Sequence, residues 1–247
     1  MIGHITYSGR LGNRMLQLAG AACLARQLHL YLSNTWFNFS APGVDHADFC
    51  KHFDINSDFF NCGNQYQEPV VHVDNNYFML HPDFALYSPG YYHFGEIFFQ
   101  NKLFTNKYWQ WLSQVYVPKM PVHKKQNQVL VYCRIGDVRP PMTATAKFYE
   151  QALGELSFDG GTILTEATQE TFIQQLSQKY KLDIQYLSPA AALYQSMHYD
   201  TMVLDEGSFS WWMGILGQPK QVIKYVSPPD HSFCLNFALS SWKQIHG

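Results

Sequence analysis

The chain has 247 residues, a length that suits one large domain or two small ones. Charged residues make up 15% of the sequence and aromatic residues 16%, which excludes an intrinsically disordered chain and allows a sizeable core. The net charge of −2 and the absence of a long basic stretch argue against a nucleic-acid partner.

A membrane-spanning helix needs about 20 consecutive apolar residues. The best largely apolar run, Leu16 to Ala25, is about half as long, so we expect no transmembrane segment. The first ten residues show no basic and apolar regions of a signal peptide. Five scattered cysteines outside paired motifs indicate reduced thiols and a cytoplasmic location: Cys23, Cys50, Cys62, Cys133 and Cys234.

Hydrophobic patterns predict an α/β organisation in the N-terminal half. The predicted elements are a strand at 2–7, a long buried helix from Arg14 to Leu30, a strand at 69–73, and a helix that follows a loop at 89–99 and ends near Tyr116. Residues 33–68, rich in Asn, Asp and Phe, are predicted to be irregular. The stretch 117–128, polar with two prolines, is a candidate linker between domains 1–120 and 121–247.

The C-terminal half alternates apolar runs with helical patterns. Strands are predicted at 129–133, 161–166, 183–188, 201–205 and 221–226, and helices at 170–180, 189–199, 208–216 and 231–245. Repeated strand–helix units predict a doubly wound parallel sheet.

Residues that follow these strands are candidates for ligand binding, because ligands of doubly wound sheets lie beyond the carboxyl ends of the strands. Helix N-termini favour phosphate, and an arginine at a strand end supplies a planar fork for a pair of phosphates. Together these features predict a ligand that contains a diphosphate. The residues concerned are Gly9, Arg10, Leu11, Gly12, Asn13, Arg134, Gly136, Asp137, Thr165, Glu166, Asp205, Ser208, Phe209 and Ser210.

Each of these pieces alone also has a structural interpretation. A Gly-x-x-Gly stretch is more often a tight turn than a ligand loop, a lone arginine is more often at the surface or ion-paired, and Glu166 and Asp205 also suit helix capping. No Walker loop, G-x-G-x-x-G or G-x-S-x-G motif occurs. The spacing of His46, Cys50 and His52 fits no standard zinc site. No D-x-D tripeptide occurs either, so we expect no metal held to a diphosphate by that device.

Four stretches resemble signatures of the α-1,2-fucosyltransferases and follow that family's order. "GRLGNRM" at 9–15 resembles the family's "GRLGNQM", and "GSFSWW" at 207–212, after the pair Leu193-Tyr194, resembles its late signature. "YCRIGD" at 132–137 resembles "HxRRGD", and also the "RIG" of protein O-fucosyltransferases, while "GYYH" at 90–93 resembles "GYFQ".

The resemblance implies a GT-B fold, with two Rossmann-like domains facing a central cleft and the nucleotide sugar on the C-terminal domain. It implies an inverting, metal-independent transfer of fucose from GDP-fucose to a hydroxyl of a glycan acceptor, with no other cofactor. The acceptor pocket would be shaped by residues 33–68. Ile135 and Tyr132 replace an arginine and a histidine of the family pattern. Two alternatives therefore stay open: a different GDP- or UDP-sugar donor, and a non-catalytic glycan-binding protein with a decayed transferase fold.

The resemblance also implies roles for single residues. Negative charge builds on the departing diphosphate, and Arg134 with backbone N–H donors would neutralise it. We expect Asp137 to orient Arg134 or the sugar, and Asn13, with Arg10, to reach the donor from the N-terminal domain.

A general base is expected on the N-terminal face. His93 ranks first because histidine titrates near neutral pH, ahead of Glu96 and Asp45. A half-buried packing role for His93 is the alternative. Trp211 and Trp212 are expected in the core and not as sugar platforms.

Overall fold

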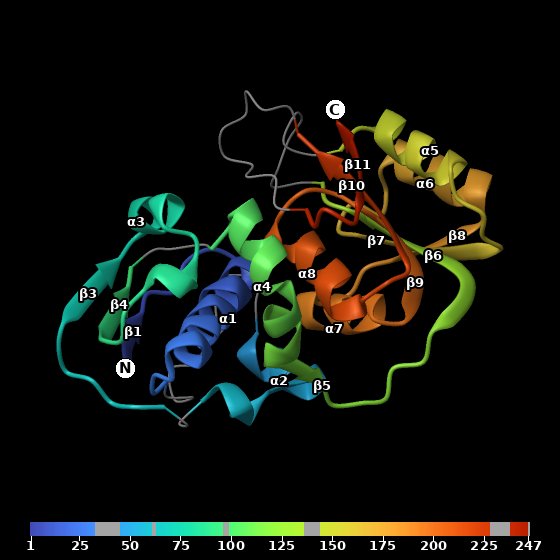
Figure 1. Cartoon of the computed structure of the whole chain (residues 1–247). Coiled ribbons are helices and arrows are strands. Elements are labelled where there is room, and N and C mark those ends of the chain that lie inside the picture. The colour runs from blue at the N-terminus through green and yellow to red at the C-terminus, as the bar shows by residue number, and fades with distance from the viewer. Residues whose placement is uncertain (33–44, 61–62, 96–98, 136–143, 228–237, 247) are drawn as a thin grey trace. The chain divides into compact units, whose positions relative to one another are not determined.

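The structure is a computed structural model of the chain and describes residues 1–32, 45–60, 63–95, 99–135, 144–227 and 238–246. The chain folds into two compact units, Met1–Lys119 and Met120–Gly247 (Figure 1). Each unit mixes helices with a parallel sheet, which confirms the predicted α/β class. None of the helices in the described ranges has the length and hydropathy needed to cross a membrane.

The first unit is built on a three-stranded parallel sheet with the order β1-β4-β3. These strands are β1 (Ile2–Ile5), β4 (Tyr91–Phe94) and β3 (Val70–Val73). Two further strands, β2 (Phe53–Ile55) and β5 (Tyr116–Pro118), form a separate antiparallel pair. The helices are α1 (Leu11–Leu28), α2 (His46–His52), α3 (Asn75–Leu80) and α4 (Lys102–Val115), with 3-10 turns at Ser57–Phe59 and Phe84–Leu86.

Helix α1 is the most deeply buried element of this unit and packs against α4. It begins at Leu11, three residues before the predicted start, and Leu11 and Gly12 are already buried in its first turn. It ends at Leu28, and its C-cap residue His29 adopts a left-handed conformation and donates its N–H to the Ala25 and Arg26 carbonyls. Beside it, an aromatic core brings rings to centroid distances of 4.9–6.2 Å among Phe78, Phe84, Phe94, Phe99, Phe104 and Tyr108.

Two predictions for this unit were wrong. Residues 91–94, predicted as part of a loop, form the central strand β4, because Tyr92 and Phe94 alternate into the core while Tyr91 and His93 stay half-buried. Part of the segment 33–68 is regular, because α2 and β2 lie within it. The Asp45 side chain caps the N-terminus of α2 by accepting from the Ala47 N–H.

The second unit is a doubly wound sheet of six parallel strands with the order β11-β10-β9-β6-β7-β8. Its strands are β6 (Lys125–Cys133), β7 (Gly160–Thr165), β8 (Leu182–Gln185), β9 (Tyr199–Leu204), β10 (Gln221–Val226) and β11 (Lys243–His246). Counted from β6 as the first strand, the order reads 3-2-1-4-5-6, the order of dinucleotide-binding folds.

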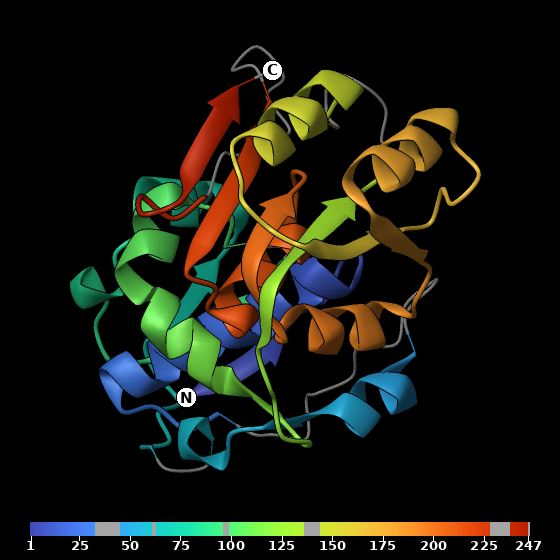
Figure 2. The same ribbon diagram turned by 90° about the vertical axis from the view of Figure 1, so that its right-hand side faces the viewer.

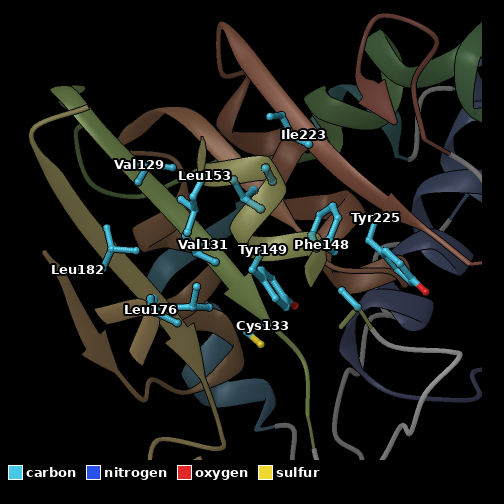
Figure 3. Close-up of a cluster of buried hydrophobic side chains, with 14 of the residues drawn as sticks. Val129, Val131, Cys133, Phe148, Tyr149, Leu153, Leu176, Leu182, Ile223 and Tyr225 are labelled. Carbon is cyan, nitrogen blue, oxygen red and sulfur yellow. The ribbon is translucent and has the colours of Figure 1, made fainter. Parts of the chain in front are cut away.

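Helices cover both faces of this sheet. Helices α5 (Ala146–Gly154) and α6 (Thr171–Tyr180) lie on one face, and α7 (Pro189–Ser196) and α8 (Ser208–Gly217) on the other (Figures 1 and 2). Figure 3 shows the core under α5 and α6, where Val129, Val131 and Cys133 of β6 meet Phe148 and Tyr149 of α5. Burial on both faces explains why these strands read as continuous apolar runs.

Two elements of this unit differ from prediction. Helix α5 was not predicted, although Phe148, Tyr149, Ala152 and Leu153 give it one buried face. The predicted helix at 231–245 is wrong at its end, where β11 pairs with β10; residues 231–237 lie outside the described residues.

Buried tyrosines predict loss of the fold at alkaline pH. Burial raises the pKa of Tyr92 to about 12 and holds the pKa values of Tyr116 and Tyr149 well above 10. Between pH 10 and 12 the unfolded chain releases these protons while the folded chain keeps them, so the free energy of unfolding falls as pH rises. Exposed tyrosines ionise without unfolding, so the signal of interest is the later rise in tyrosinate absorbance from the buried side chains. We expect that later rise to appear together with unfolding. Ionisation of all the tyrosines in a chain that stays folded would contradict this account.

Candidate functional site

The strand order places a topological switch point at the carboxyl ends of β6 and β9. The chain leaves β6 toward β7 on one side, and the strands that follow β9 lie on the other side, so the connections diverge at this point. Arg134 directly follows β6, and Asp205 directly follows β9. The two ends are joined by a hydrogen bond of 3.3 Å from the Asp205 N–H to the Tyr132 carbonyl.

The carboxylate of Asp205 connects the segments at this switch point. Asp205 is 1% exposed, and its side chain accepts hydrogen bonds from four donors among the described residues. The donors are the N–H groups of Arg134 (3.1 Å), Ala144 (2.9 Å) and Glu206 (2.7 Å), and the Tyr149 hydroxyl (2.8 Å). Asp205 therefore ties the end of β6, the entry to α5 and its own loop together.

Burial keeps the neighbours of this carboxylate protonated. Desolvation, with a further contribution from the Asp205 charge, raises the pKa of Tyr149 well above its ordinary value. Burial likewise raises the pKa of the Cys133 thiol at the end of β6. Tyr149 therefore remains a hydrogen-bond donor to Asp205 at neutral pH, and Cys133 remains a packing residue.

Arg134 lies against the N-terminus of α8. Gly207 is the N-cap of that helix, and a Cβ atom added to it would lie 3.0 Å from Arg134 Nη1. The Arg134 side chain is half-buried, as are Ser208 and Phe209 in the first helical turn. A guanidinium beside first-turn N–H groups is an arrangement that binds phosphate.

Glycine at position 207 is required by its φ of 110°, and a Cβ atom there would also make a tight contact with Arg134 Nη1. We expect Gly207→Ala to lower the free energy of unfolding by at least about 1 kcal/mol, measured by urea denaturation. Gly154→Ala is the matched control, because a Cβ there would meet nothing within 4 Å. Equal stability of the two variants would contradict the requirement for glycine at this φ.

A buried lysine that sequence reasoning missed supports the same turn. Lys224 of β10 is 2% exposed, and its Nζ donates to the Asp205 carbonyl at 2.8 Å and to Ser210 Oγ at 3.0 Å. The Ser210 hydroxyl also donates to the Asp205 carbonyl, so this predicted ligand-binding hydroxyl is engaged inside the protein. A lysine within the apolar run "QVIKYV" was the signal in the sequence.

The remaining predicted residues of this unit lie at the strand ends and the start of α8, or outside the described residues. Thr165 ends β7 with its hydroxyl accepting from the Ala167 N–H at 3.1 Å, and Glu166 is exposed beside it. Phe209 contacts the Tyr132 ring at a centroid distance of 5.5 Å. Gly136 and Asp137 lie outside the described residues. Trp211 and Trp212 are fully buried, which confirms their predicted place in the core.

The loop after β1 in the first unit is held by Gln17, another residue that sequence reasoning missed. Gln17 is fully buried, accepts from the Ser8 N–H at 3.0 Å and donates to the Thr6 carbonyl at 3.1 Å. Gly9 has a φ of 73°, and its carbonyl accepts from Arg14 Nε at 3.0 Å. The loop is thus fixed by buried side-chain contacts before α1 begins.

The predicted ligand residues at the start of α1 have different environments. Arg10 is exposed at the N-cap, whereas Leu11 is 1% exposed and belongs to the core. Gly12 is buried in the first turn. The side-chain oxygen of Asn13 accepts a hydrogen bond of 2.8 Å from Gln100 Nε2.

The predicted general bases are dispersed. His93 lies on β4, with its ring 5.1 Å from that of His72 and 5.0 Å from that of Tyr91. Asp45 serves as the N-cap of α2, and Glu96 lies outside the described residues.

Among the described residues, no group of three or more His, Cys, Asp or Glu side chains is arranged to hold a metal ion. His46 and Cys50 are in contact, with 3.5 Å between Nε2 and Sγ. Comparison of the chain with models of protein families gives no match, and comparison with curated proteins gives none either.

Proposed function

We propose that this chain is an inverting, metal-independent glycosyltransferase that moves fucose from GDP-fucose to a hydroxyl group of a glycan. The observation that carries the proposal is the Arg134 guanidinium against the N-terminus of α8. Both lie at the switch point of a sheet whose strand order is that of nucleotide-binding folds. The "GRLGN" and "SFSWW" stretches begin α1 and α8, each after a parallel strand.

The chemistry required is neutralisation of a leaving diphosphate. When the bond between sugar and phosphate breaks, negative charge grows on the phosphate oxygens. A planar guanidinium and helix N–H groups, held in place before the reaction, stabilise that charge more than they stabilise the ground state. In the proposed mechanism Arg134 and the first turn of α8 supply this stabilisation without a metal ion.

The proposal includes a GT-B arrangement of the two units. In it the second unit, Met120–Gly247, binds the nucleotide sugar, and the first unit supplies the acceptor side and the base. His93 is the proposed base, supported by its half-buried position next to the carboxyl end of β4. Arg10 and Asn13 are proposed to reach the donor from the start of α1.

A panel of nucleotide sugars tests the proposal. The protein is incubated with GDP-fucose, other GDP-sugars and UDP-sugars in the presence of EDTA, and release of nucleoside diphosphate is measured. We expect release from GDP-fucose above all others, at a rate that added magnesium or manganese does not change. Release that depends on a metal ion, or no release from any donor, would count against the proposed reaction.

A different GDP- or UDP-sugar donor is the second candidate. It is favoured by Ile135, which follows Arg134 and leaves one guanidinium where the fucosyltransferase pattern has two. In the same panel, preferential release from another donor would identify it. A chain that binds glycans, releases nothing and gains no thermal stability from nucleotides would instead be a glycan-binding protein.

A further inference from the structure

Three buried charged side chains surround the first turn of α8. Asp205 is 1% exposed, Glu206 6% and Lys224 2%. The two acidic residues directly precede the N-cap Gly207, and the lysine reaches the same turn from β10. Charges are buried in proteins only when partners compensate for the lost hydration, so each of these has a structural reason.

The contacts separate the two carboxylates from the ammonium group. The Asp205 carboxylate faces the N–H groups of Arg134, Ala144 and Glu206 and the Tyr149 hydroxyl. The Glu206 carboxylate accepts from the Ser227 N–H at 2.9 Å.

Lys224 donates to the backbone carbonyl of Asp205, which belongs to the peptide bond between Asp205 and Glu206. The ammonium therefore lies inside the turn that carries both acidic residues. Its second acceptor, Ser210 Oγ, is in the first turn of α8, so Lys224 also fixes that turn to the end of β9.

The buried carboxylates of Asp205 and Glu206 disfavour anion binding at the N-terminus of α8. An anion at the N-terminus of α8 approaches two buried carboxylates, and like charges repel strongly where water is excluded. The helix dipole contributes only about half an elementary charge against them. Arg134 and Lys224 are the two cations that the described residues bring to this turn.

We propose that Lys224 is a charge-compensating positioning residue that allows the N-terminus of α8 to accept a diphosphate. The inference rests on the proposed function, because it takes the diphosphate of the donor as the anion. Lys224 donates to Ser210 Oγ and to the Asp205 carbonyl. In the proposal, its charge offsets that of the Glu206 carboxylate from within the same turn.

The test uses GDP as the probe and calorimetry as the measurement. Lys224→Met removes the charge and keeps the length of the side chain, and we expect GDP to bind at least about 30-fold more weakly. Adding Glu206→Gln to that variant removes the opposing charge while keeping an oxygen for the Ser227 N–H. The double variant is expected to regain most of the lost affinity. Lys220→Met is the matched control, because the Lys220 side chain is 82% exposed just before β10.

The double variant separates charge compensation from a purely structural role. If Lys224 only braces the turn, removing the Glu206 charge will not restore binding, and that result would overturn the proposal. If Lys224→Met does not fold, we expect the double variant to fold, because the opposing Glu206 charge is gone. A double variant that also fails to fold would overturn the proposal.

Failure of the proposed function gives a different result. Wild-type protein that binds no nucleoside diphosphate would refute the donor site. The charge compensation between Lys224 and Glu206 can still be tested in that case, because it also affects the stability of the fold. Lys224→Met is expected to lower the urea midpoint, and Glu206→Gln in that background is expected to raise it again. Strictly additive effects of the two substitutions would overturn the compensation whatever the ligand.

Discussion

Arg134→Ala is expected to lower kcat/KM for the nucleotide sugar by about 10²–10³-fold, the usual cost of removing one preorganised donor to a developing charge. The fold should be unaffected, because Arg134 is half-buried and its backbone N–H, which bonds Asp205, is retained in alanine. Turnover is measured as release of nucleoside diphosphate, and the fold is checked by the urea midpoint.

Two further variants sharpen this prediction. Arg134→Lys keeps the charge but loses the planar fork, so we expect it to recover only part of the rate. Lys147→Ala removes an exposed cation from α5 in the same unit and should leave turnover unchanged. Wild-type turnover in Arg134→Ala would refute the role given to the guanidinium.

Asp205→Ala is expected to destabilise the second unit strongly. It leaves buried donors of Ala144, Tyr149 and Glu206 without their acceptor. Each unsatisfied buried donor costs about 1–3 kcal/mol, so a loss of roughly 3 kcal/mol or more is expected, a large part of a typical domain's stability. Urea denaturation gives the free energy of unfolding, with Asp183→Ala on the exposed side of β8 as the control.

The isosteric variant Asp205→Asn refines the interpretation. Its amide keeps one carbonyl acceptor but turns a donor toward other donors, so we expect a stability between those of wild type and Asp205→Ala. Nucleotide binding should weaken in both variants, because Asp205 fixes Arg134 relative to β9. Wild-type stability of Asp205→Ala would show that these four hydrogen bonds are not important to the fold.

The sheet of the second unit was largely predictable from sequence. Strands buried on both faces read as continuous apolar runs, so 161–166, 201–205 and 221–226 match β7, β9 and β10 closely. The short strands β4 and β11 were not predicted. Their sequences, YYHF and KQIH, contain fewer β-branched apolar residues than those of β1 and β3, and each strand is stabilised by pairing with neighbours distant in sequence.

The sequence predicted which segments of the candidate site lie together, but not the buried hydrogen bonds that hold these segments in place. Strand ends identified Arg134 and the start of α8, because parallel strands bring their carboxyl ends to one edge. The sequence does not reveal that the Asp205 carboxylate accepts hydrogen bonds from Arg134, Ala144 and Tyr149, since these residues are distant from it in the chain. Gln17 and Lys224 left a weaker signal, a long polar side chain inside an apolar run.

The most direct test of the central claim is a crystal structure of the protein with GDP bound. The account predicts phosphate oxygens within about 3 Å of the Arg134 guanidinium and of N–H groups in the first turn of α8. A nucleotide bound away from the ends of β6 and β9, with Arg134 not in contact with phosphate, would contradict it.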